Sequence, residues 1–206
     1  MNLPEIYRQI VAELNKGIVT PRILLDRLRV SDEVYRKSSE YQDSRYVPFF
    51  YHLGKFISPK NLFQLGVSLG FPICSLLQSC ESVEKIFLFQ PRSNQFFSPR
   101  LAISNIKDYF KGDLGYSYGH FTDVEFTENF DKGNWDFAFV NVIATLDSYR
   151  NYLDLIWQQM PVGGILAVDY LSSYQESKEA FSIFCKIVNR EPVVFDTRNG
   201  TGLIQK

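Results

Sequence analysis

The feature that most constrains the fold is a regular alternation of short apolar runs and amphipathic segments over the last three quarters of the chain. The runs expected to form strands are 61–65, 83–89, 114–118, 135–140 and 165–168. Segments with apolar residues at helical spacing lie between or after them, at 71–79, 99–111, 122–129, 147–160 and 174–189. Apolar strands separated by helices are typical of a buried parallel sheet. The alternation therefore predicts a doubly wound α/β fold with helices on both faces.

The first part of the chain follows a different pattern. Pro4 and the pair Thr20-Pro21 suit the first turns of helices, and Gly17 suits a helix end. We therefore expect residues 1–45 to form an N-terminal helical extension. The remaining residues, 46–206, are assigned to the α/β domain.

The two ends of the α/β domain carry their own signals. An aromatic-rich helix is expected over 48–56, where packing in the core is the simplest reason for the aromatic residues. Two short apolar runs, 192–196 and 202–205, flank an Asn-Gly pair, and this arrangement predicts two antiparallel strands.

Composition excludes several classes of protein. Hydrophobic residues make up 45% of the chain and charged residues 22%, which is typical of a globular domain. The formal net charge of −1 gives no broad electrostatic surface for nucleic acid or an anionic membrane. No apolar stretch is long enough to span a membrane, and the first residues lack the pattern of a secretory signal. Three cysteines without a CxxC pair are consistent with reduced thiols, so we expect a cytoplasmic protein.

A glycine-rich turn follows the first expected strand. The strand leads through Gln64 into Gly66-Val67-Ser68-Leu69-Gly70. A glycine at the carboxyl end of a strand lets the backbone turn sharply and approach a ligand closely, and the next helix points its amide end toward the same crevice. Tight packing of that helix against the sheet is the alternative reason for the glycines.

This turn resembles the nucleotide-binding loop of the class I S-adenosylmethionine-dependent methyltransferases, especially the Gly-Val-Ser-x-Gly turn of small-molecule O-methyltransferases. Further segments similar to this family lie at 88–91, 119–121, 135–141, 161–170 and 199–204. The resemblance covers about residues 46–206. It implies a Rossmann-like, mostly parallel seven-stranded sheet with the last strand antiparallel. It also implies S-adenosylmethionine as the cofactor and a small molecule as the methyl acceptor.

The same resemblance implies which residues would bind the cofactor. They are Gln64, Gly66, Val67, Ser68, Gly70, Gln90, His120, Phe121 and Asn141. The family usually has acidic residues where this chain has Gln64, Gln90 and Asn141, and frequently an Asp in place of His120. Amide and imidazole side chains keep hydrogen-bonding capacity but lose the negative charge. At the ribose position, Gln90, this loss would cost about 1–2 kcal/mol of binding free energy.

Two residues are candidates for catalysis. Asp169 follows the fifth expected strand, where it would act as a base, and a capping or ion-pair role is the alternative. His120 would act as a base or contact the adenine, and a hydrogen-bonded position in the pocket wall is the alternative. Metal-dependent relatives use carboxylates where this chain has Asn141, Asp169 and Tyr170. We expect no metal, because a hard divalent cation prefers several charged oxygen ligands.

Two functions are open on the sequence. The first is methylation of a small molecule with S-adenosylmethionine, with the N-terminal helices as a lid or as the contact to a homodimer or protein partner. The second is a catalytically degenerate methyltransferase fold that serves as a binding or structural module in a larger assembly. The replaced acids favour the second function, and the glycine loop favours the first, because a scaffold would not need it.

Overall fold

A computed structural model describes residues 1–17, 45–92, 99–120, 130 and 133–206. Its helices are α1 (Leu3–Asn15), α3 (Tyr46–Ile57), α4 (Phe71–Leu77), α5 (Pro99–Tyr109), α7 (Leu146–Gln158) and α8 (Gln175–Ile187). Its strands are β1 (Asn61–Leu65), β2 (Lys85–Pro91), β3 (Asp113–Gly119), β4 (Phe137–Val140), β5 (Ile165–Val168), β6 (Val193–Phe195) and β7 (Thr201–Gln205). The helices expected from Thr20-Pro21 and over 122–129 lie outside the described residues. Across the parts of the chain that are described, no helix has the length and apolar character needed to span a bilayer.

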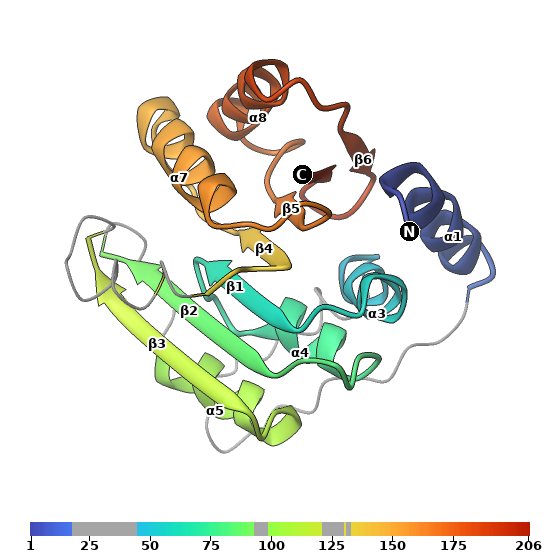
Figure 1. Ribbon diagram of the computed structural model, residues 1–206, viewed down its shortest axis with the longest axis vertical. Coiled ribbons are helices and arrows are strands. Elements are labelled where there is room, and N and C mark those ends of the chain that lie inside the picture. The colour runs from blue at the N-terminus through green and yellow to red at the C-terminus, as the bar shows by residue number, and fades with distance from the viewer. Residues whose placement is uncertain (18–44, 93–98, 121–129, 131–132) are drawn as a thin grey trace.

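The strands form one seven-stranded sheet in the order β3-β2-β1-β4-β5-β7-β6 (Figure 1). Strands β1 to β5 pair in parallel, whereas β7 runs antiparallel to both of its neighbours. The predicted doubly wound sheet with an antiparallel last strand is confirmed. The chain moves outward from β1 to β3 and then returns to place β4 on the other side of β1. Ligands of open α/β sheets bind at such a reversal of strand order.

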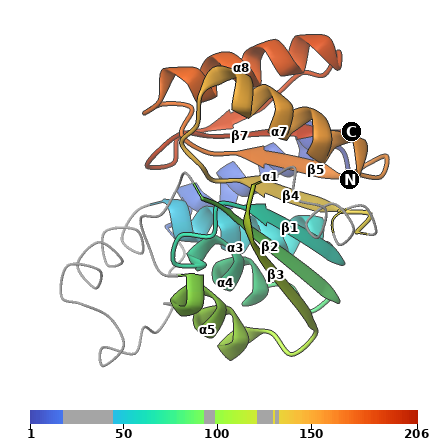
Figure 2. The same cartoon turned by 90° about the vertical axis from the view of Figure 1, so that its left-hand side faces the viewer.

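Helices cover both faces of the sheet (Figure 2). One face packs against α1, α3, α4 and α5, and the other packs against α7 and α8. Because successive side chains of a strand point to opposite faces, each central strand supplies both cores. In β4, for example, Phe139 lies in the first core and Val140 in the second.

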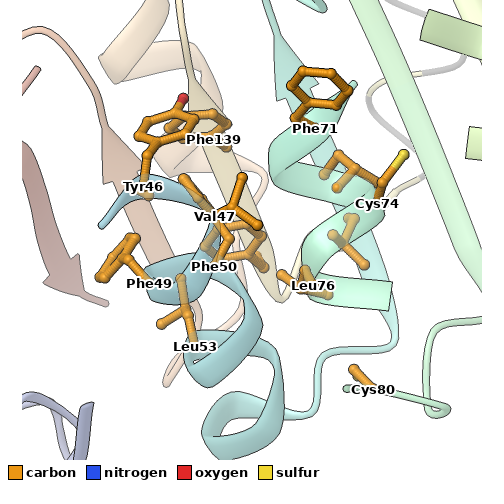
Figure 3. Close-up of a cluster of buried hydrophobic side chains, with 14 of the residues drawn as sticks. Tyr46, Val47, Phe49, Phe50, Leu53, Phe71, Cys74, Leu76, Cys80 and Phe139 are labelled. Carbon is orange, nitrogen blue, oxygen red and sulfur yellow. The ribbon is translucent and has the colours of Figure 1, made fainter. Parts of the chain in front are cut away.

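The aromatic residues of α3 form the centre of the first core (Figure 3). Phe49 and Phe50 are fully buried, and the ring of Phe50 meets the ring of Phe139 at a centroid distance of 4.8 Å. Edge-to-face contacts of this kind add about 0.5–1.5 kcal/mol to the burial of apolar area. The aromatic residues at the start of the α/β domain are therefore core residues.

The first helix packs on this same core. Leu3, Ile6 and Ile10 of α1 are buried among residues of α3 and the sheet. The ring of Tyr7 lies 4.9 Å from that of Phe195 in β6, and the backbone N–H of Leu3 donates to Gln205 Oε1 of β7 at 3.0 Å. α1 thus lies against α3 and the antiparallel end of the sheet, while the assignment of residues 1–45 as an extension stays a prediction.

Candidate functional site

Four polar side chains lie where the central strands end. Gln64, Gln90, Asn141 and Asp169 lie at the carboxyl ends of β1, β2, β4 and β5. By the alternation of strand side chains, all four are on the face that α3 and α4 cover. All four are also buried. These residues therefore lie at one edge, close to the reversal of strand order, and their roles there stay predictions.

Two features of the turn require glycine: positive φ angles and close packing against neighbouring backbone. Gly66 has a φ of +82°, and a Cβ at this position would lie 2.1 Å from the carbonyl oxygen of Asn141. Gly70, with a φ of +77°, precedes α4, and its Cβ would lie 3.1 Å from the carbonyl oxygen of Ala102. Both positions need glycine with or without a ligand. The glycines alone consequently do not favour cofactor binding over a scaffold role, contrary to the interpretation from sequence.

Two glutamines brace this turn. Gln64 donates from Nε2 to the carbonyl oxygen of Gly66 at 2.7 Å. Gln90 accepts the backbone N–H of Val67 on its Oε1 at 2.8 Å. The oxygen of Gln90, which was expected to face a ribose, is thus directed at the loop.

Two other oxygens at this edge have no donor. Gln64 Oε1 and Asn141 Oδ1 are buried, and neither has a hydrogen-bond partner among the described residues. A buried acceptor without a donor costs about 1–3 kcal/mol, and such groups are uncommon in folded proteins. Both oxygens belong to residues expected in the cofactor site. The pair therefore calls for a donor that the described residues do not supply.

A small cavity lies against Asn141. Its volume is about 10 Å³, and it is lined by Tyr46, Ser68, Leu69, Phe71, Pro72, Asn141 and Tyr170. A volume of this size holds about one water molecule.

Pro72 lies in the first turn of α4 and has no N–H, so the expected amide end of this helix lacks one donor.

Asp169 is fully buried, and both of its carboxylate oxygens accept hydrogen bonds. Tyr46 Oη and Asn199 Nδ2 donate to its Oδ2 at 3.0 and 3.1 Å, and Thr201 Oγ1 donates to its Oδ1 at 3.2 Å. Burial raises the pKa of Asp169 to about 6, although these hydrogen bonds and one from the backbone N–H of Tyr170 oppose the shift. The carboxylate therefore joins α3 to β5 and β7, and its role as a base stays a prediction.

The remaining candidate residues occupy different environments. Val67 is fully buried, Ser68 lines the cavity with a positive φ of 48°, and His120 is exposed just after β3. Phe121 lies outside the described residues. In the described ranges, no three His, Cys, Asp or Glu side chains are grouped so that they could hold a metal ion.

Two partners of Asp169 were not anticipated. Asn199 and Thr201 follow β6 and begin β7, about thirty residues after the aspartate in sequence. In the observed register Val168 pairs with Gly202, which places Thr201 beside Asp169. The signal in the sequence for this contact is the antiparallel register of the last strand, which its alternating residues specify.

Comparisons with known proteins locate this fold. No protein-family model and no curated protein matches the sequence. Solved structures do match. The O-methyltransferase TomG from Streptomyces achromogenes, in complex with SAM, is 9% identical with a TM-score of 0.64, and the alignment covers 98% of each chain. The SAH-bound methyltransferase PaMTH1 from Podospora anserina is 15% identical with a TM-score of 0.60, covering 100% of this chain and 97% of that one. The chain has a methyltransferase-like fold.

A third structure agrees with this fold assignment. The O-methyltransferase from Bacillus cereus in complex with SAH is 12% identical with a TM-score of 0.59, and the alignment covers 98% of this chain and 91% of that one. At these identities the likeness concerns the methyltransferase-like fold alone. The suspected resemblance in fold to class I methyltransferases is confirmed, while function has to be argued from the site.

Proposed function

We propose that this protein binds S-adenosylmethionine at the carboxyl ends of β1, β2 and β4 and methylates a small molecule. The observation that carries the proposal is the pair of buried acceptors without donors, Gln64 Oε1 and Asn141 Oδ1. The amino-acid end of S-adenosylmethionine carries an ammonium group, which has three N–H donors. Cofactors of open α/β sheets bind at this reversal of strand order, and SAM or SAH is present in the similar structures.

The residues of this chain would bind and orient the cofactor, which when bound supplies an electrophilic methyl group. Gln64 and Asn141 would accept hydrogen bonds from the ammonium, and Gln90 would hold the turn in place through Val67. Asp169 would act as a positioning residue, since it fixes Tyr46 in the cavity wall. Holding reactants in alignment is a large part of catalysis for a transfer of this kind.

A second candidate function is a scaffold that has lost the cofactor. It is favoured by Gln90, whose oxygen is taken by the loop, and by Pro72, which removes an N–H from the start of α4. The cavity of about 10 Å³ beside Asn141 also favours it. A protein of this kind would have kept the fold as a binding or structural module.

Calorimetry with S-adenosylmethionine and S-adenosylhomocysteine tests the first function. The informative variant is Asn141→Leu, which removes the free acceptor at similar volume. Its matched control is Asn151→Leu on the exposed surface of α7, which makes the same chemical change on the other face of the sheet. Circular dichroism spectra should show that both variants are folded.

We expect the wild type and Asn151→Leu to bind the cofactor equally, and Asn141→Leu to lose at least about tenfold in affinity, as expected for a lost hydrogen bond to a charged group. Absence of heat with both compounds in the folded wild type would overturn this function and leave the scaffold role. Equal binding by the two variants would show that the cofactor lies elsewhere.

A further inference from the structure

A wide groove lies away from the candidate functional site. It runs between α8 and the edge strand β6 and has a volume of about 1020 Å³. Figure 1 shows α8 on one side of β6 and α1 on the other. Neither the candidate cofactor residues nor the catalytic candidates line it.

The floor of this groove is apolar. Leu171, Phe181 and Cys185 are buried beneath it, whereas Val194 of β6 is 51% exposed. Val193 and Phe195 point to the face covered by α1 and α3, so Val194 points to the face of α8. Helix α8 therefore leaves the end of the sheet partly uncovered.

The rim of the groove is positively charged. Lys178, Lys186 and Arg190 line it together with a single acid, Glu191, which leaves two excess positive charges on a chain whose net charge is −1. Within the described structure, none of the three cations forms an ion pair. Lys178 and Lys186 are eight residues apart on α8, or about 12 Å along the helix axis. The charge is thus spread along the groove.

One wall of the groove is the edge strand β6. β6 ends the strand order and, among the described strands, pairs with β7 alone. Alternate residues of β6 point their backbone groups away from β7, toward the position that a further strand would take. An added strand would lie along α8, under the two lysines.

We propose that this groove binds an extended acidic segment of a partner protein, which adds a strand to β6. Main-chain hydrogen bonds to the edge would supply affinity, and alternate side chains would supply specificity. Acidic residues on one side of the segment would meet Lys178, Lys186 and Arg190. Apolar residues at the alternate positions would point to the opposite face of the sheet, on the side of Phe195 and α1. A small anion would need cations gathered at one point, whereas a segment with several carboxylates matches charges spread over two helical turns.

Fluorescence anisotropy with the full chain tests this proposal. The probe is a fluorescein-labelled Glu-Val-Glu-Val-Glu-Val peptide, and its control has lysine in place of each glutamate. The groove variant combines Lys178→Glu, Lys186→Glu and Arg190→Glu. The matched variant makes the same charge change in and just after α5, at the far end of the molecule in Figure 2, with Arg100→Glu, Lys107→Glu and Lys111→Glu. Circular dichroism checks that both are folded.

We expect the acidic peptide to bind the wild type and the α5 variant alike, and the groove variant at least about tenfold more weakly. The lysine peptide should not bind. No binding of the acidic peptide with protein up to about 0.5 mM would overturn the proposal. Equal losses in the two variants would do the same, because net charge alone would then explain the binding.

Two further peptides test the pairing with β6. One is N-methylated at the valine amides and the other at the glutamate amides. Alternate N–H groups of a strand point to the same side, so one of the two peptides should bind about tenfold more weakly than the other. Equal affinity of the two would overturn strand addition. None of these measurements depends on cofactor binding, so the proposal stands or falls separately from the proposed function.

Discussion

The two halves of the carboxyl edge of the sheet differ in the hydrogen bonding of their buried polar groups. At the end of β5, Asp169 receives hydrogen bonds from Tyr46, Asn199 and Thr201. At the ends of β1 and β4, Gln64 and Asn141 each have a buried oxygen that accepts no hydrogen bond from the described part of the chain. Folded proteins satisfy nearly all buried polar groups. Among the described residues, the hydrogen bonding of the β5 end is complete, whereas that of the β1–β4 end is incomplete, as our proposal of a bound cofactor there requires.

The largest expected effect concerns the backbone that shapes the incomplete half. Gly66→Ala should lower the free energy of unfolding by about 3–5 kcal/mol, because the Cβ would collide with the carbonyl of Asn141 and the positive φ is unfavourable. Urea denaturation measures this loss. The control is Gly163→Ala, which has a φ of +91° but nothing within 4 Å of the added Cβ, so it should lose only about 1–2 kcal/mol. Equal losses would refute the packing role of Gly66.

The next prediction concerns Asp169 in the complete half and the pH dependence of the free energy of unfolding. The native pKa of Asp169 is about 6 against an ordinary value of 3.8, so the native state binds the proton more tightly than the unfolded state. This contribution to stability is full below pH 4 and declines as the pH rises to about 6, by about 3 kcal/mol in total. Asp169→Asn should remove that decline. Unfolding curves between pH 4 and 8 measure it, and an unchanged pH profile in the variant would contradict the assignment.

A smaller effect of opposite sign is expected in the incomplete half. Asn141→Leu should raise the free energy of unfolding of the ligand-free protein by about 1 kcal/mol, since it removes a buried acceptor that has no donor. Asn151→Leu on exposed α7 should change it by less than about 0.5 kcal/mol. Thermal unfolding compares the two variants. A clear loss of stability in Asn141→Leu would mean that the oxygen is satisfied in solution.

An effect of similar size is a gain in cofactor affinity. Gln90→Glu restores the family's usual acid, whose one oxygen would still accept the N–H of Val67 while the other accepts from a ribose hydroxyl. We expect S-adenosylmethionine to bind up to about tenfold more tightly. Gln158→Glu on exposed α7 is the control with the same change of charge. Calorimetry measures both, and tighter binding by the control alone would rule out a specific contact at Gln90.

Hydrophobic patterns were sufficient to predict the sheet but not the contacts of its polar residues. The strands 61–65 and 165–168 coincide with β1 and β5, because an unbroken buried run has few alternative structures. The resemblance to a known family placed Gln64, Gln90 and Asn141 at one edge. It did not show that Gln90 turns toward Val67, because that orientation depends on the path of the loop.

Longer-range contacts were also beyond the sequence patterns. The partners of Asp169 come from the start of α3 and from β7, which are distant in sequence and meet only when the sheet is complete. Packing was an open reason for Gly66, but its partner was hidden, because the contact is with the backbone of Asn141, which follows a neighbouring strand. Periodicity describes one segment at a time, whereas these contacts join segments through tertiary packing.

Tyr46 belongs to both halves of the edge. Its hydroxyl donates to Asp169, and the residue lines the cavity beside Asn141. A ligand that contacted Tyr46 in this cavity would therefore be thermodynamically linked to order in the first turn of α3, and the linkage would be equal in both directions. A bound ligand should slow amide exchange at the start of α3. A change that frays this turn should in turn weaken the binding of the ligand, and the coupling free energy is the same in both cases.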